Sequence, residues 1–288
     1  MPISFSSKLT DAFATSQLCV GIDPHESSLI EAGLENSTQG LETFSRTLLA
    51  QCVGRAKIVK PQVSFFERFG SVGFMVLEKL CREATEAGML VIADAKRGDI
   101  GSTMAAYGSA WLGQAAPFLV DALTVSPYLG FDSLHEISAL ASERNKAIFV
   151  LCATSNPEAT KIQSAQISDQ TVAAAIWQDI TKLNQVISAS ANGFGNIGAV
   201  IGATVNLSAV GLGAEVLAHS NNSAAVMTSV LAPGFGFQGA KLSQAREIFG
   251  ALAGQAIFSV SRSLLEFGLE NAGRSIEAAN AELGSKHD

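Results

Sequence analysis

Four charged residues, Asp94, Lys96, Arg97 and Asp99, lie close together in the ten-residue stretch from Asp94 to Thr103, which reads DAKRGDIGST. Five apolar residues, 89–93, precede it, so we expect a buried strand that ends by presenting Asp94, Lys96 and Asp99. Residues two apart in a strand point the same way, which places Lys96 beside Asp94. A lysine between carboxylates stays protonated, so Lys96 is predicted to donate a proton rather than to act as a nucleophile.

This charge pattern continues at two other predicted strand ends. Lys60 follows the strand expected at 56–59, and Asp23 follows the one at 18–22. A carboxylate beside a proton donor would repel an anionic group that a reaction removes, which favours decarboxylation with protonation over Schiff-base chemistry. The alternative interpretations are a solvated polar turn and a network of salt bridges at the rim of the fold without catalysis.

A second group of residues is suited to binding phosphate. The segment 234–239 reads GFGFQG, and the absence of a Cβ at Gly234 and Gly236 lets backbone N–H groups approach a ligand. Arg262 adds a planar fork of donors that matches phosphate. The alternative is a flexible glycine-rich turn beside a surface arginine.

The elements that must position these residues alternate along the whole chain. Short apolar runs predict eight strands, at 18–22, 56–59, 89–93, 122–125, 147–152, 197–201, 226–231 and 256–260. Apolar residues at helical spacing predict helices at 41–53, 72–87, 104–115, 171–189 and 207–219. Parallel strands buried on both faces read as continuous apolar runs, so the pattern predicts an α/β fold, a (β/α)8 TIM barrel, as one domain over 1–288. Within it we expect a variable surface excursion at about 158–196 and a polar C-terminal tail.

A doubly wound sheet is the rival architecture. No GxGxxG motif follows the first strand, and polar residues recur after nearly every strand rather than at one switch point. In a barrel the loops that follow the strands share one face, and phosphate is commonly bound after strands seven and eight. The residues predicted to converge on that face are Asp23, Lys60, Asp94, Lys96, Ser155, Gln238 and Arg262.

Composition argues against several other functions. The net charge of −7 disfavours nonspecific binding to nucleic acid, which needs a basic face. No apolar stretch approaches the roughly 20 residues of a membrane helix, and the N-terminal residues do not resemble a secretory signal, so we expect a cytoplasmic protein without a membrane partner. The four cysteines are widely spaced and lack the paired spacing of metal ligands, so no metal site is expected.

Eight motifs cover most of the chain, namely LCVGIDPH (18–25), KPQVSFFERFG (60–70), DAKRGDIGST (94–103), SPYLG (126–130), TSNP (154–157), GAT (202–204), APGFGFQG (232–239) and SR (261–262). In this order and spacing they resemble the orotidine 5′-phosphate decarboxylases, specifically the bacterial-type second subfamily. The resemblance implies a homodimeric (β/α)8 barrel with no metal or organic cofactor. It also implies conversion of orotidine 5′-phosphate to uridine 5′-phosphate (UMP) and CO2, the last step of UMP synthesis.

The resemblance further implies a role for each matching residue. Lys96 would donate the proton to C6 of the pyrimidine, Asp94 would lie beside the departing carboxylate, and Lys60 would support the charge network. Asp99 and Thr103 would reach across the dimer interface into the active site of the partner. The remaining implied contacts are Asp23 and Lys60 with the ribose, Ser155 with the pyrimidine edge, and Gln238 and Arg262 with the phosphate.

Three residues depart from the family pattern. Phe237 stands in the glycine-rich loop where a smaller residue is expected, and Glu158 and Ser263 stand where glycine is usual. Two other functions remain open. One is a metal-dependent phosphosugar aldolase or synthase of the same barrel suprafamily, which shares Asp-x-Lys-x-x-Asp but not the KPQ segment at 60–62 or the TSNP motif. The other is a catalytically inactive nucleotide-binding barrel.

Overall fold

Eight parallel strands close into a barrel in the computed structural model, which describes residues 3–187, 193–213, 216–217 and 226–284. Their order around the barrel is β1-β12-β11-β9-β5-β4-β3-β2. The strands are β1 (Leu18–Ile22), β2 (Ile58–Pro61), β3 (Leu90–Arg97), β4 (Ala122–Val125), β5 (Ala147–Ala153), β9 (Ile197–Ile201), β11 (Val230–Ala232) and β12 (Ala256–Val260). The predicted (β/α)8 fold is therefore confirmed.

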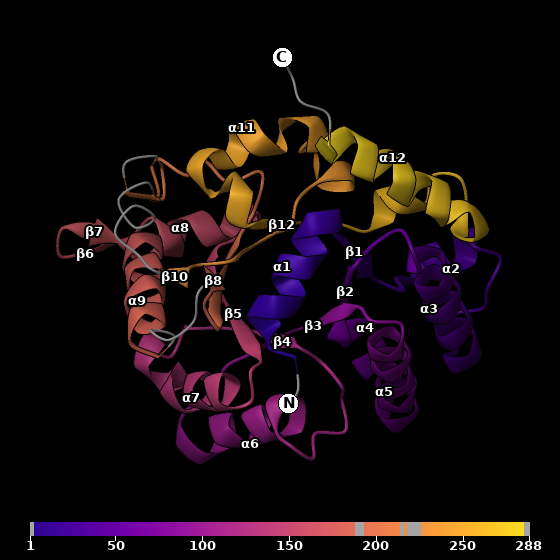
Figure 1. Ribbon diagram of the computed structural model, residues 1–288, viewed down its shortest axis with the longest axis horizontal. Coiled ribbons are helices and arrows are strands. Elements are labelled where there is room, and N and C mark those ends of the chain that lie inside the picture. The colour runs from indigo at the N-terminus through magenta and orange to yellow at the C-terminus, as the bar shows by residue number, and fades with distance from the viewer. Residues whose placement is uncertain (1–2, 188–192, 214–215, 218–225, 285–288) are drawn as a thin grey trace.

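Helices surround this ring of strands, and Figure 1 shows them on its outer side. Those that the structure describes are α1 (Phe5–Thr15), α2 (Glu26–Glu31), α3 (Thr38–Cys52), α4 (Val63–Glu67), α5 (Gly70–Glu86), α6 (Gly101–Leu112), α7 (His135–Glu143), α8 (Thr160–Gln163), α9 (Val172–Ile187), α11 (Ala245–Phe249) and α12 (Ala272–Gly284). The longer ones are amphipathic. In α5, for example, Val76, Leu77 and Leu80 are buried against the strands, as expected of a helix with one apolar face.

The barrel is closed at one end by the N-terminal helix. Every residue of β1, β9 and β12 is buried, which fits strands covered on both faces. Phe5 and Leu9 of α1 belong to the cluster of side chains inside the barrel, where the ring of Phe5 meets that of Phe149 edge-on with 6.0 Å between centroids. Figure 1 shows α1 lying across the opening. The opposite end of the barrel, formed by the carboxyl ends of the strands, remains accessible.

Some boundaries differ from the predictions. The strand expected at 226–231 is split into β10 (Val226–Met227), which pairs with β8 (Gly193–Phe194) outside the barrel, and β11. The helix expected at 207–219 is not formed at its start, where 207–211 are turns; residues 214–215 and 218–219 lie outside the described residues. Asn206 explains the turns, because its side chain accepts a hydrogen bond from the N–H of Ala209 at 3.1 Å and so competes with a helix.

The segment 158–196 has regular structure of its own. It begins with the short helices η2 (Pro157–Ala159) and α8, followed by the hairpin of β6 (Gln166–Ile167) and β7 (Gln170–Thr171). Helix α9 then packs against the barrel, with Trp177 and Ile180 buried. The hairpin is thus an addition at the periphery, whereas α9 is one of the barrel's helices.

Candidate active site

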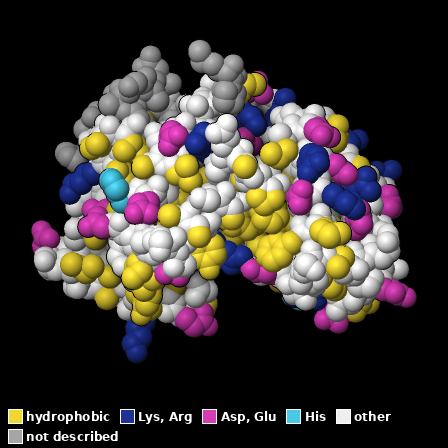
Figure 2. Space-filling view, turned by 90° about the horizontal axis from the view of Figure 1, so that it is seen from below, with side chains coloured by type: hydrophobic (Ala, Val, Ile, Leu, Met, Phe, Trp, Pro, Cys, Tyr) yellow, Lys and Arg dark blue, Asp and Glu magenta, His cyan; other side chains and the backbone are white. Residues whose placement is uncertain are grey.

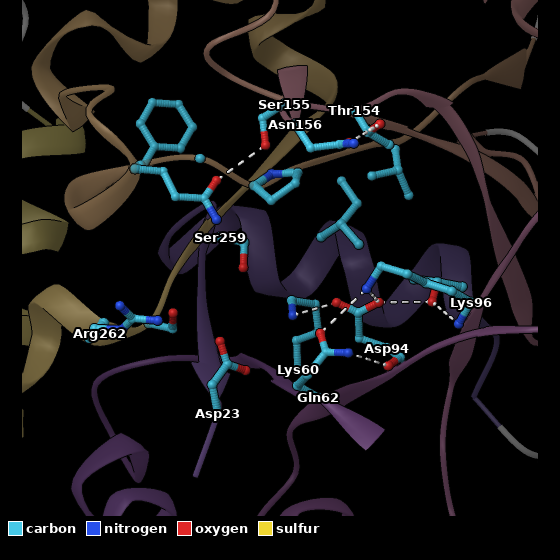
Figure 3. A pocket seen from close by; sticks show the side chains of 18 of the residues that line it. Asp23, Lys60, Gln62, Asp94, Lys96, Thr154, Ser155, Asn156, Ser259 and Arg262 are labelled. Atoms are coloured by element: carbon cyan, nitrogen blue, oxygen red, sulfur yellow. Dashed lines mark hydrogen bonds and ion pairs between the residues drawn. The ribbon is translucent and has the colours of Figure 1, made fainter. Parts of the chain in front are cut away.

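A cavity of about 570 Å³ opens at the carboxyl ends of the strands. Figure 3 shows the charged and polar side chains that point into it from different strands. Among its lining residues are Asp23, Lys60, Gln62, Asp94, Lys96, Thr124, Ser155, Asn156, Gly234, Phe237, Gln238, Ser259 and Arg262. Residues up to 239 positions apart in the sequence therefore meet in one place, as the barrel predicts.

The carboxylate of Asp94 lies at the centre of the charged group. Its Oδ2 accepts a hydrogen bond from Lys60 Nζ at 2.8 Å, and its Oδ1 accepts one from Lys96 Nζ at 2.6 Å. The hydroxyl of Thr124 donates a third to Oδ1 at 2.9 Å. The side chains of Lys60 and Asp94 are 7% and 10% exposed, whereas that of Lys96 is 46% exposed. The Lys60–Asp94 pair is thus buried, and Lys96 remains in reach of solvent.

The opposite charges around each member of this pair decide its charge state. Burial alone would raise the pKa of the Asp94 carboxyl, but Lys60 and Lys96 outweigh it and hold that pKa well below its usual range. Burial alone would likewise lower the pKa of the Lys60 ammonium, but Asp94 and Asp23 hold it above the ordinary lysine value. Both groups are therefore ionised at neutral pH.

Lys96 reaches Asp94 by a route that strand alternation does not describe. Its φ of 49° lies in the left-handed region, and the pairing of β3 with β4 shifts register between Ala93 and Arg97. The backbone N–H of Lys96 donates to Thr124 Oγ1 at 2.9 Å, which helps to hold this conformation. A non-glycine residue in that region is strained and persists only where its surroundings fix it. The predicted neighbourhood of Asp94 and Lys96 is found, but a turn in the backbone produces it.

Two residues that the sequence analysis did not single out complete the charged group. Thr124 connects Asp94 to the backbone of Lys96, as described above. Gln62 donates to the backbone oxygen of Asp94 at 3.2 Å and accepts from Lys96 Nζ at 3.4 Å. Thr124 could have been found as the one hydroxyl in the otherwise apolar strand β4, and Gln62 by its place in the KPQ segment.

The opposite side of the cavity carries the residues predicted to bind phosphate. Ser155 Oγ donates to Gln238 Oε1 at 3.2 Å, which joins the loop after β5 to the loop after β11. Gly234 and Gly236 have φ of 113° and 73°, so both positions favour glycine. Gly234 lines the cavity; Gly236 does not, although its neighbours Phe235 and Phe237 do. Arg262 lies at the end of β12 with its guanidinium over the ring of Phe237.

Asp23 lines the same cavity with part of its hydrogen-bonding capacity unused. Its Oδ1 is buried and accepts no hydrogen bond from the described residues. A buried acceptor without a donor is unfavourable unless a ligand or water supplies one. Asp23 is therefore available to a hydroxyl group of a bound molecule.

Asp99 and Thr103 lie outside the cavity of their own chain. The charge pattern alone grouped Asp99 with Asp94 and Lys96, whereas the family resemblance implied that Asp99 and Thr103 serve the partner. The carboxylate of Asp99 accepts a hydrogen bond from the backbone N–H of Ile100 at 2.8 Å, and Thr103 is exposed on the first turn of α6. Neither residue is among those that line the cavity of this chain.

Other features of the described residues bear on metal and thiol chemistry. No group of three or more His, Cys, Asp or Glu side chains there is placed to hold a metal ion. The four cysteines are free and buried, and burial raises the pKa of each thiol to about 12. Among the same residues, no helix has the length and apolar character to cross a membrane.

These observations define a class of protein: a (β/α)8 barrel with a charged cavity at the carboxyl ends of its strands. Comparison with known proteins identifies the family within this class. Residues 16–275 match the Orotidine 5′-phosphate decarboxylase / HUMPS family, and the chain belongs to that family. The match covers most of the sequence and includes all the candidate site residues.

Individual relatives agree with this assignment. The chain is 46% identical over 268 residues to an orotidine 5′-phosphate decarboxylase of Corynebacterium glutamicum, covering 92% of each protein. It is 46% identical over 253 residues to one of Streptomyces coelicolor, covering 87% of this chain and 85% of the relative. Among solved structures it resembles a candidate orotidine 5′-phosphate decarboxylase of Streptomyces avermitilis, with a TM-score of 0.88, 41% identity, and coverage of 98% and 96%.

Proposed function

We propose that this chain catalyses the decarboxylation of orotidine 5′-phosphate to UMP and CO2, without a cofactor and with Lys96 as the proton donor. The observation that carries the proposal is the ionised Asp94 held between the ammonium groups of Lys60 and Lys96 in the barrel cavity. The family and its relatives support the substrate. A metal-dependent phosphosugar aldolase or an inactive nucleotide-binding barrel is less favoured, because the relatives compared above are named as the decarboxylase.

The charges suggest how the reaction is driven. With the substrate carboxylate beside Asp94, two like charges face each other, and this repulsion is relieved when CO2 leaves. The electron pair of the broken C–C bond stays on C6, where the nearby ammonium groups stabilise the developing negative charge. Lys96 then transfers a proton to C6. Because its side chain is 46% exposed, it can regain a proton from solvent.

The remaining residues of the cavity are assigned to binding. We propose that Asp23 and Lys60 contact the ribose hydroxyls and that Ser155 contacts the pyrimidine edge. Gln238, Arg262 and the backbone of Gly234 are assigned to the phosphate. Gly236, which was expected to bind it as well, is assigned to the shape of the loop, because its N–H donates to Ala240 O at 2.8 Å. Contacts remote from the reacting carbon supply the binding energy that offsets the unfavourable placement of two carboxylates together.

We also propose that the active enzyme is a homodimer in which Asp99 and Thr103 serve the partner's cavity. Exposed apolar side chains in the segments that follow β3 and β4 support this, since Ile100, Tyr128 and Leu129 are 61%, 77% and 53% exposed. Figure 2 shows hydrophobic side chains gathered around a hollow on one face. Contiguous exposed apolar surface is typical of an interface.

The compartment and the other partners are also proposals. We propose that the enzyme acts in pyrimidine biosynthesis in the cytoplasm, where thiols stay reduced, because all four cysteines are free. The net charge of −7 supports the absence of a nucleic-acid partner. We further propose that residues 1–288 act as one domain.

An ultraviolet absorbance assay with orotidine 5′-phosphate, with and without a chelator, tests the reaction. We expect turnover that the chelator leaves unchanged. Turnover that disappears with chelator would favour metal-dependent chemistry, and no turnover by a folded dimer would favour the inactive barrel. Lys96→Ala should abolish decarboxylation with the fold intact, as judged by circular dichroism, and near-normal kcat would contradict the role of Lys96.

A further inference from the structure

Phe237 is a large apolar residue in the loop assigned to the phosphate, at a position where a smaller residue was expected. Its ring lies under the guanidinium of Arg262, with 3.9 Å between the guanidinium carbon and the ring centroid. Both residues line the cavity. We propose that Phe237 is a positioning residue that orients Arg262 for the phosphate group of the ligand. This inference rests on the proposed function, because it takes Arg262 as the phosphate contact.

The backbone around Phe237 is held in place by its own hydrogen bonds. Phe237 is the middle residue of the short helix η3 (Gly236–Gln238). The N–H of Gly236 donates to Ala240 O at 2.8 Å, and that of Gly239 donates to Gly236 O at 2.9 Å. Gly236 and Gly239 have φ of 73° and 108°, which few other residues adopt. The loop is therefore a defined turn that fixes where the ring of Phe237 emerges.

The same turn is pressed against the residues that follow β12. A Cβ added to Gly236 would lie 2.2 Å from Ser263 Oγ, so only glycine allows this approach. Ser263 belongs to the short helix η6 (Arg262–Leu265), directly after Arg262. The contact between Gly236 and Ser263 therefore places their neighbours Phe237 and Arg262 opposite each other. Two departures from the family pattern, Phe237 and Ser263, are thus in adjoining positions.

Arg262 has no carboxylate partner within salt-bridge distance among the described residues, and the ring of Phe237 contacts its guanidinium face. A cation over an aromatic face is attracted by the negative charge of that face. The five N–H donors of a guanidinium point outward in its plane. Stacking therefore leaves them available to a phosphate, while it limits the directions in which the plane can turn. An arginine already oriented loses less conformational freedom on binding.

Phe237 contributes little to the core of the protein. It is 68% exposed, so its replacement should leave the fold intact. A matched control is available in Phe267, which is 58% exposed and lies outside the cavity that holds Arg262. Phe237→Leu and Phe267→Leu remove the same chemical group from similar exposure. Phe237→Tyr keeps an aromatic face and serves as the conservative variant.

The test measures binding of UMP and of uridine by calorimetry, and kcat and KM for orotidine 5′-phosphate. Phe237→Leu should weaken UMP binding and raise KM by roughly 2- to 5-fold, the range for a cation–π contact at an exposed site, with a smaller effect on kcat. Uridine lacks the phosphate, so its affinity should not change. Phe237→Tyr should retain near wild-type values, and Phe267→Leu should match wild type.

Three results would overturn the inference. One is unchanged UMP affinity in Phe237→Leu, and another is equal loss of UMP and uridine affinity. The third is a loss of UMP affinity that is as large when Phe237→Leu is added to Arg262→Ala as when it is added to wild type. A residue that acts through Arg262 should have little effect once Arg262 is removed. A wild-type protein that binds UMP but does not turn over orotidine 5′-phosphate would refute the proposed function and leave this binding test valid. Wild-type protein that binds neither nucleotide would overturn both.

Discussion

Replacing Asp94 by Asn would remove the negative charge from the centre of the site while keeping the shape of the side chain. The carboxylate accepts hydrogen bonds from Lys60 at 2.8 Å, Lys96 at 2.6 Å and Thr124 at 2.9 Å. An asparagine can keep one oxygen acceptor, but its NH2 group would face a donor. Lys96 can turn to solvent because its side chain is 46% exposed, whereas Lys60 at 7% exposure cannot. The loss of stability therefore arises mainly at Lys60.

The magnitude of the loss has two bounds. Removing one partner of a buried ion pair typically lowers the free energy of unfolding by about 3–5 kcal/mol. Lys60 can also escape the penalty by releasing its proton, which at pH 7 costs about 4.6 kcal/mol for a lysine with the ordinary pKa of about 10.4. We therefore expect Asp94→Asn to be less stable than wild type by about 3–4.5 kcal/mol at pH 7.

The pH dependence gives the sharper test. In wild type the pKa of Lys60 is raised, so its stabilising contribution is present below about pH 10 and is lost only as pH rises further. In Asp94→Asn the carboxylate that counteracted the effect of burial is gone, so burial lowers the pKa of Lys60. The folded state then binds fewer protons than the unfolded state. Stability of the variant then rises with pH. The difference from wild type should shrink between pH 7 and pH 10.

Urea unfolding at fixed protein concentration, followed by fluorescence of the buried Trp111 and Trp177, measures both quantities. The double variant Lys60→Met/Asp94→Asn is the control, because it removes the buried charge as well and should be more stable than Asp94→Asn alone. A deficit below about 1 kcal/mol at pH 7, or one that stays constant up to pH 10, would refute the reasoning. So would a double variant less stable than the single one.

Three further predictions follow from the same site. Arg262→Ala should raise the KM for orotidine 5′-phosphate by roughly 10- to 100-fold, as expected for lost charged hydrogen bonds, and an unchanged KM would contradict the phosphate assignment. Inactive Asp99→Ala and Lys96→Ala protomers, allowed to exchange subunits, should regain about one quarter of wild-type activity, because half the dimers are mixed and each has one intact site. No recovery despite proven exchange would argue against shared sites. The ionised Asp94, whose pKa is depressed in the folded state, stabilises the fold above about pH 4, and this contribution should be lost as the pH falls further. The urea midpoint of wild type should therefore fall faster in acid than that of Asp94→Asn. Midpoints of wild type that fall no faster would contradict this prediction.

Much of the fold could be predicted from the sequence because barrel strands carry a strong local signal. The bounds predicted for β1, β4, β9 and β12 are those of the structure, because a strand buried on both faces must be apolar throughout. The prediction was wrong at 226–231, where one apolar run supplies two short strands in different sheets. Hydrophobicity records that a segment is buried, but not which neighbour it pairs with.

The sequence predicted which residues form the candidate site better than it predicted how they are arranged. Asp23, Lys60, Asp94 and Lys96 could be assigned to one cavity because each follows a strand, and a barrel brings all strand ends to one face. Asp99 was not in that set, because the family resemblance assigned it to the partner's cavity. Its carboxylate accepts a hydrogen bond from the N–H of Ile100, and it does not line the cavity of its own chain.

The sequence by itself thus determined the architecture and the set of charged residues, since both depend on patterns within short segments. Tertiary structure decided the left-handed turn at Lys96, the hydrogen bonds from Thr124 that link it to Asp94, and the closure of the barrel by α1. It also decided that Phe237 stacks on Arg262. These features depend on contacts between residues far apart in the chain and on backbone dihedrals that such contacts hold in place, and neither leaves a periodic trace in the sequence.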